Sequence, residues 1–307
     1  MSCCGSKKAT SCCQPKPSCC KSTDEPLPSC FGTAADSSRK LDVNVSADER
    51  RAVVQEGYRK VALNDQPNQT TTAIAESLGY TKEDLEYVGD AANLGLGCGN
   101  PLAGAGIKEG NVVVDLGSGA GIDVLLAARI VGPKGKVYGV DFTPEMIQRA
   151  QLNASAKGAM NTEFLLGDLT DLPLDDEIAD VIISNCVINL VPEKDQVFKE
   201  AYRVLKHGGH LIVSDMVLLK PISAKLRSSA AAHVGCIAGA VMRDEYISIM
   251  QSAGFKTPQM IESKYIDEGT FTHHEETGRI TVNKFEFKPE PSSDTFSCAL
   301  KTIAVKE

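Results

Sequence analysis

The residues with the clearest chemistry are glycines that follow a short apolar run. Apolar and mostly β-branched side chains stand at Val112, Val113, Val114 and Leu116, which predicts a strand buried on both faces. Gly117, Gly119 and Gly121 come next, and a glycine backbone can turn sharply and lie against a ligand. Residues 122–131 then predict a buried helix with free N–H groups at its start. A strand, a glycine loop and a helix in this order are typical of a nucleotide-binding edge of a parallel sheet.

The spacing of the glycines excludes two common nucleotide sites. The dinucleotide fingerprint requires a glycine where Ile122 stands, and the P-loop sequence Gly-Lys-Ser/Thr is absent. The pattern Asp-x-Gly-x-Gly-x-Gly that remains resembles motif I of the class I S-adenosylmethionine-dependent methyltransferases. That resemblance implies that the methionine part of S-adenosylmethionine is held by Asp115, Gly117, Ser118 and Gly119. The alternative is a glycine turn with a purely structural role.

Two carboxylates end the next two predicted strands. Asp141 closes the strand 136–141, where a carboxylate can accept both hydroxyls of a ribose. Asp168 closes the strand 162–168. The methyltransferase resemblance implies that Asp168 binds the adenine amino group, that the backbone of Leu169 lies on the ring and that Asn185 also contacts the cofactor. The alternative is that both aspartates are solvated strand ends.

Cysteine is unusually frequent, with 11 in the chain and seven in the first 30 residues. Residues 1–40 are rich in Ser, Cys, Lys and Pro without periodicity, which predicts a disordered tail. Its adjacent Cys-Cys pairs lack the Cys-x-x-Cys spacing of a zinc finger. Thiolates prefer soft ions, so the tail is either a metalloid trap or, as we favour, a segment without a role in catalysis.

Three cysteines of the body, Cys98, Cys186 and Cys236, each lie in or beside a predicted loop. Loops at one edge of a doubly wound sheet converge in space, and three thiolates there would bind a thiophilic centre such as As(III). The alternative is that each cysteine is simply packed in the core.

Over roughly residues 48–260 the chain resembles the arsenite S-adenosylmethionine methyltransferases. The most specific match is Ser184-Asn-Cys-Val-Ile-Asn-Leu190, and the segments around residues 97–99 and 235–240 match its two other cysteine segments. The resemblance implies that Cys98, Cys186 and Cys236 bind As(III) as a trithiolate, while Cys298 is structural. The chain departs from the family at Leu96, where a Tyr is common, and residues 31–97 lack a further cysteine that some members carry.

The chemistry implied by the resemblance is methyl transfer to arsenite or methylarsenite for detoxification. The lone pair of As(III) attacks the sulfonium methyl group in line, so the protein contributes mainly alignment and no general base. A thiol reductant such as glutathione or thioredoxin would restore the thiols. The alternatives are a methyltransferase for a small organic acceptor, such as a quinone precursor, and a thiol-rich metalloid-binding protein.

Composition limits the class of protein. The 307 residues are 42% hydrophobic and carry a net charge of −8, which fits a globular protein and argues against a nucleic-acid partner. Apolar runs are too short for a membrane span, and no secretory signal is visible. The expected location is therefore the cytoplasm.

The alternation of strands and helices predicts an α/β fold, a class I methyltransferase-like doubly wound, mostly parallel sheet with an N-terminal helical lid and additional C-terminal strands. The expected units are the tail 1–40, the lid 41–100, the Rossmann-like cofactor core 101–220 and a C-terminal substrate-binding region 221–307. Further helices are expected over 48–62, 70–79, 81–91, 193–205, 224–240 and 244–253. Further strands are expected over 180–190, 210–215, 278–287 and 296–305.

Overall fold

Three helices precede the sheet in the computed structural model, which describes residues 46–64, 69–228, 232–233, 236–267, 271–273, 280–282 and 295–307. They are α1 (Ala47–Ala62), α2 (Gln69–Leu78) and α3 (Lys82–Val88). Ser46 with Glu49, and Thr81 with Asp84, form capping boxes that start α1 and α3. These helices confirm the elements expected there, whereas the tail 1–40 lies outside the described residues.

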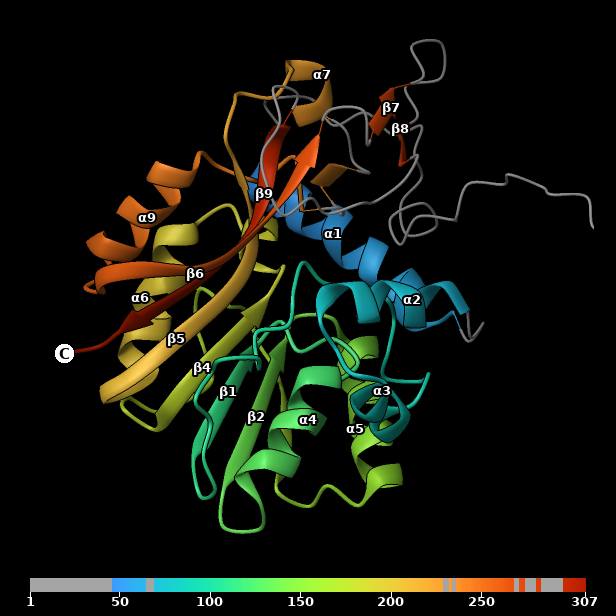
Figure 1. The fold of residues 1–307 in the computed structure, drawn as a ribbon, viewed down its shortest axis with the longest axis vertical. Helices are drawn as coiled ribbons and strands as arrows, with labels where there is room; N and C mark the ends of the chain where they lie inside the picture. The colour runs from blue at the N-terminus through green and yellow to red at the C-terminus, as the bar shows by residue number, and fades with distance from the viewer. Residues whose placement is uncertain are drawn as a thin grey trace, which may run out of the picture.

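A seven-stranded sheet forms the centre of the fold (Figure 1). Its order is β3-β2-β1-β4-β5-β9-β6, and β1 to β5 pair in parallel while β9 runs antiparallel to both of its neighbours. The sheet confirms the expected doubly wound, mostly parallel architecture. The strands are β1 (Val112–Leu116), β2 (Lys136–Asp141), β3 (Thr162–Leu166), β4 (Ala179–Asn185), β5 (Leu205–Leu218), β6 (Lys256–Asp267) and β9 (Thr295–Val305).

Helices cover both faces of the sheet, and the strand sequences reflect this. Helices α4 (Ile122–Val131) and α5 (Pro144–Lys157) lie on one face, and α6 (Lys194–Val204) and α9 (Arg243–Ser252) lie on the other (Figure 1). Val113 packs in the core of the first face and Val114 in the core of the second. Because successive strand residues point to opposite faces, a strand with both faces covered is mainly apolar. β1 and β4 follow this rule, with the buried Asp115 of β1 and Ser184 of β4 as exceptions.

The structure corrects several expected elements. β5 (Leu205–Leu218) begins earlier and ends later than the strand expected over 210–215. Among the described residues, the helix expected over 224–240 begins as α7 (Ala224–Arg227), and residues 236–240 are not helical. At Gly239 an added Cβ would lie 2.0 Å from the carbonyl oxygen of Asn189, so close backbone approach replaces helical packing there. Of the strand expected over 278–287 the structure describes β8 (Ile280–Val282), paired with β7 (Phe271–His273), and the rest of that range lies outside the described residues. Strand β6 was not predicted.

No helix among the described segments has both the length and the apolar character to cross a membrane. Helix α1 crosses the carboxyl ends of the central strands (Figure 1). It covers the edge at which the glycine loop lies.

Candidate active site

The glycine loop forms one wall of a cavity at the carboxyl edge of β1. The N–H groups of Gly117 and Ser118 donate to the carbonyl oxygen of Val140 at 2.8 and 3.0 Å, which folds the loop against β2. An added Cβ on Gly117 would lie 2.4 Å from Val187. An added Cβ on Gly119 would meet no atom within 4 Å, although this residue lines the cavity. A side chain at position 119 would therefore project into space that a ligand can use.

Asp115 supplies a buried negative charge to this cavity. Its side chain is 2% exposed and lines the cavity. Among the described residues no hydrogen bond to its carboxylate is found. Burial, together with the charges of Asp123 and Asp141, raises the pKa of Asp115 well above its usual range. A buried carboxylate without a partner fits a cationic group, and the ammonium and sulfonium of S-adenosylmethionine are such groups.

Asp141 is positioned to accept hydroxyl groups. Its two oxygens accept the N–H groups of Thr143 at 2.8 Å and Gly119 at 3.0 Å. Burial raises the pKa of Asp141, and the two N–H donors offset part of that rise. Each oxygen keeps a further lone pair, so the carboxylate can still accept the two hydroxyls of a ribose.

A second, smaller cavity adjoins the first and contains Asp168 and Leu169. Oδ1 of Asp168 accepts the N–H and the hydroxyl of Thr170 at 2.9 and 2.8 Å. Oδ2 lies 3.3 Å from Nε of Arg51 on α1. The cavity is otherwise largely apolar, with Val54 and Leu190 in its wall. An apolar lining of this kind suits the adenine ring expected here, and Arg51 is a contact that the sequence did not indicate.

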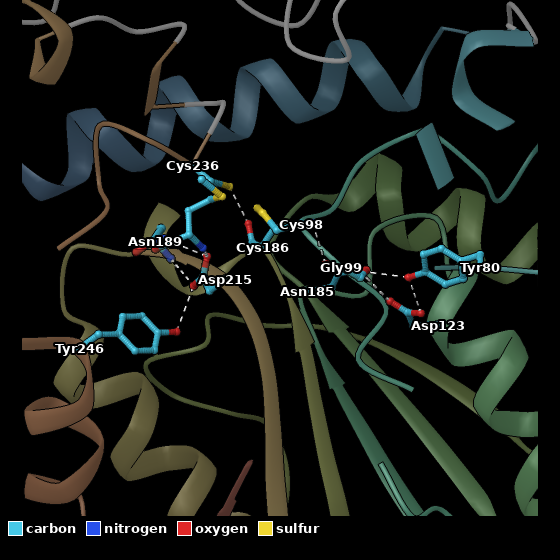
Figure 2. Close-up of a disulfide and its surroundings, with 11 residues drawn as sticks. Tyr80, Cys98, Gly99, Asp123, Asn185, Cys186, Asn189, Asp215, Cys236 and Tyr246 are labelled. Atoms are coloured by element: carbon cyan, nitrogen blue, oxygen red, sulfur yellow. Dashed lines mark hydrogen bonds between the residues drawn. A yellow bond between two sulfur atoms is a disulfide. The ribbon is translucent and has the colours of Figure 1, made fainter. Parts of the chain in front are cut away.

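The three body cysteines come together at the same edge (Figure 2). Cys98 lies in the loop before β1, Cys186 follows β4, and Cys236 lies after β5. Cys98 and Cys186 form a disulfide with their Cα atoms 5.4 Å apart, whereas the sequence analysis expected both as thiolates. The short Cα separation allows the bond. Two electrons from a reductant must open it before both sulfurs can bind a ligand.

Cys236 lies beside this disulfide as a free thiol. Its Sγ donates to the carbonyl oxygen of Cys186 at 2.6 Å and accepts a hydrogen bond from the Tyr58 hydroxyl on α1. Burial, and then the charge of Asp215, raises the pKa of Cys236 well above its usual range. Cys186 and Cys236 both have positive φ, 60° and 61°. Such backbone is costly for residues other than glycine and is found at functional sites where the surroundings enforce it.

Asn185 connects the cysteine loops to each other. Its side-chain oxygen accepts the Cys98 N–H at 3.0 Å, and its amide donates to the Gly99 carbonyl at 2.9 Å and the Tyr80 hydroxyl at 3.0 Å (Figure 2). Tyr80 in turn donates to Asp123 at 2.8 Å. Asn185 lines the larger cavity, and its expected contact with the cofactor stays a prediction. Its hydrogen bonds, however, hold the Cys98 loop against the end of β4.

A polar cluster around Asp215 lies on the other side of the disulfide. One Asp215 oxygen and the Sγ atoms of Cys98 and Cys186 all lie within 4.8 Å of one another. Burial raises the pKa of Asp215 to about 6 and lowers the pKa of nearby Lys194 to about 8. The sequence analysis missed both residues. The available signal was a carboxylate among the apolar residues of β5.

Cys298 packs in a different core cluster from the other three cysteines. It is 2% exposed, packs in the apolar core and pairs with Val217 across β5 and β9. Burial raises its pKa to about 11. The residue is therefore a packed thiol in the interior, as a structural role requires.

Known proteins resemble the chain in sequence and in structure. A methyltransferase-domain family model matches residues 107–254. An arsenite methyltransferase of Halobacterium salinarum is 40% identical over 248 residues, which are 75% of this chain and 63% of the relative. An arsenite methyltransferase of Mus musculus is 34% identical over 233 residues, 72% of this chain and 61% of the relative. The chain thus spans a little less than two thirds of the length of these curated relatives.

A solved structure shares the architecture over most of both chains. The arsenic(III) S-adenosylmethionine methyltransferase from Chlamydomonas reinhardtii has 32% sequence identity and a TM-score of 0.56, covering 76% of this chain and 73% of that one. The chain belongs to the family of arsenic(III) S-adenosylmethionine methyltransferases.

Proposed function

We propose that this chain transfers methyl groups from S-adenosylmethionine to As(III) held by Cys98, Cys186 and Cys236. The observation that carries the proposal is the meeting of three cysteines, from three separate loops, beside the glycine-loop cavity. Cys186 and Cys236 line that cavity together with Asp115 and Gly119. A thiophilic acceptor at the cysteines would therefore lie next to a cofactor in the cavity.

Residues of the glycine loop and the strand ends would hold the cofactor. Asp115 faces its cationic end, Gly117, Ser118 and Gly119 offer backbone, and Asp141 accepts its ribose hydroxyls. Asp168 and Leu169 border the apolar cavity for the adenine ring. When bound there, S-adenosylmethionine supplies an electron-poor methyl group on a sulfonium.

The cysteines would present As(III) with its lone pair free. Three Cys sulfurs occupy the pyramidal positions around arsenic, so the lone pair is the group left to attack the methyl carbon in line. Alignment of this kind can remove a large part of the activation barrier of a group transfer. As(III) has no proton to lose, and the site accordingly requires no general base.

Reduction of the Cys98–Cys186 disulfide must precede arsenic binding. A small thiol such as glutathione, or a dithiol protein such as thioredoxin, opens the bond by attack of a thiolate on one of its sulfurs. The need for a reductant fits a reducing compartment, and we therefore propose that the protein works in the cytoplasm on arsenite and methylarsenite.

The test is to incubate the protein with arsenite, methyl-labelled S-adenosylmethionine and a thiol, and to look for labelled methylarsenic. Omission of the thiol should abolish the reaction, because the disulfide then stays closed. Label in a quinone precursor, with none in arsenic, would favour a small organic acceptor. Tight arsenic binding without any transfer would favour a metalloid-binding protein.

A further inference from the structure

Asp215 is the buried charge that lies beside the disulfide sulfurs. It is 1% exposed, and one of its oxygens lies within 4.8 Å of the Sγ atoms of both Cys98 and Cys186 (Figure 2). The proposed arsenic would bond to these same two sulfurs. The carboxylate would therefore stand close to the atom that accepts the methyl group.

Four donors fix this carboxylate in place. Oδ1 accepts the side-chain amide of Asn189 and the N–H of Met216, both at 2.9 Å. Oδ2 accepts the N–H of Asn189 at 3.2 Å and the Tyr246 hydroxyl at 3.1 Å. Four hydrogen bonds use the lone pairs of both oxygens and favour the charged form. Asp215 is consequently a preorganised anion rather than a fourth ligand.

The negative charge of Asp215 does not favour the thiolate form of the cysteines. Asp215 raises the pKa of Cys236, so on its own it opposes the ligand form of the thiols. It has the right sign for the step that follows. The arsenic lone pair forms the As–C bond, the S–CH₃ bond breaks with its electrons left on the cofactor sulfur, and the positive charge moves to arsenic.

We propose that Asp215 stabilises the positive charge that arsenic acquires as it accepts the methyl group. Fixed charges aimed at developing charge in a site without water act strongly and need no reorganisation. This inference rests on the proposed function and adds to it an electrostatic role for a residue that is neither an arsenic ligand nor a cofactor contact.

Lys194 is a buried residue near Asp215 whose charge has the opposite sign, so its removal tests the same idea in the other direction. It is 6% exposed, and its ammonium donates to the carbonyl oxygens of Val191 at 3.0 Å and Asn189 at 3.5 Å. Its charge acts on Asp215 and on Cys236. A positive charge in this position opposes a cationic arsenic. Removal of Asp215 should therefore slow methyl transfer, and removal of Lys194 should accelerate it.

The experiment measures the single-turnover methylation rate of reduced full-length protein loaded with arsenite and S-adenosylmethionine at pH 7. This pH lies between the pKa values of Asp215, about 6, and Lys194, about 8, so both groups are charged. Arsenite dissociation constants are measured in parallel. Asp215→Asn should lower the transfer rate about 10- to 100-fold and change the arsenite dissociation constant by less than about twofold. Lys194→Met should raise the transfer rate above that of the wild type. A merely structural role predicts instead that both variants slow the reaction and weaken arsenite binding.

A wild-type rate in Asp215→Asn, or a rate loss matched by an equal loss of arsenite binding, overturns the inference. If Asp215→Asn does not fold, Lys194→Met decides: a raised rate supports the inference, and a rate at or below wild type with arsenite bound overturns it. Absence of methylarsenic from the wild type would instead refute the proposed function.

Discussion

Asn185→Ala should detach the Cys98 loop from the end of β4. The substitution leaves the Cys98 N–H and the Gly99 carbonyl without the hydrogen bonds that they now make at 3.0 and 2.9 Å. An unsatisfied buried backbone group costs about 1–3 kcal/mol. Both groups are only partly buried, so we expect a loss of about 2–4 kcal/mol of loop anchoring.

The loss should appear mainly at the cysteine site. A cost of 2 kcal/mol corresponds to roughly 30-fold in an equilibrium constant, and arsenite binding to the reduced protein should weaken by at least roughly tenfold. Titration calorimetry suits the measurement because the chain contains no tryptophan to report binding. Amide hydrogen exchange across residues 95–99 should accelerate in the same variant.

Asn161→Ala is the matched control. Like that of Asn185, its side chain makes two hydrogen bonds to backbone groups of another segment. Here the amide donates to the carbonyl oxygens of Ala128 and Gly132 at 3.0 and 2.9 Å. These bonds lie away from the cysteine loops, so the control should lower stability and leave arsenite binding unchanged. Equal arsenite affinities for Asn185→Ala and the wild type would refute the proposed positioning role of Asn185.

Three further predictions concern the cofactor cavity. Asp115→Asn removes the unpaired charge and should weaken S-adenosylmethionine binding about 10- to 100-fold; calorimetry showing unchanged affinity would count against the assignment. Gly119→Ala should block cofactor binding because the added methyl group enters the cavity. Gly158→Ala is the control, because Gly158 also has a positive φ and open surroundings. This control should lower the free energy of unfolding by about 1–2 kcal/mol and leave cofactor binding unchanged. Asp123 has a folded-state pKa raised to about 6, chiefly by burial. Its ionisation therefore destabilises the fold, with no cost below about pH 4 and the full cost above about pH 6. The free energy of unfolding of Asp123→Asn, measured with urea in the absence of cofactor, should therefore rise relative to that of the wild type by roughly 1–3 kcal/mol as the pH increases from 4 to 7. A difference between the two proteins that does not change with pH would contradict this.

The sequence predicted the central strands because their chemistry is local. β1 is a valine run followed by Asp115 and Leu116, and β2 ends at Asp141; the structure has both strands with the expected bounds. The start of helix α3, expected at residue 81, likewise depends on a capping box between residues three apart, Thr81 and Asp84. Elements whose form depends on distant neighbours were predicted poorly. The segment around Gly239 is bent by contact with Asn189, which lies in another element.

The same distinction applies to the site. The convergence of Cys98, Cys186 and Cys236 could be predicted because strand order brings loops of one edge together, and the structure does bring them together. The disulfide could not be predicted, because it depends on a Cα separation that only the folded chain fixes. The partners of Asp215 come from β5, the turn at Asn189 and helix α9, and no spacing in the sequence indicates that they meet.

Arsenic K-edge X-ray absorption on the reduced protein loaded with one arsenite tests the central claim most directly, because it counts the sulfur atoms bound to arsenic. The wild type and Cys298→Ser should both show three sulfur ligands. Each of Cys98→Ser, Cys186→Ser and Cys236→Ser should show two sulfur ligands or lose the arsenic. Three sulfur ligands in any one of these last variants, with no thiol added, would contradict the trithiolate site.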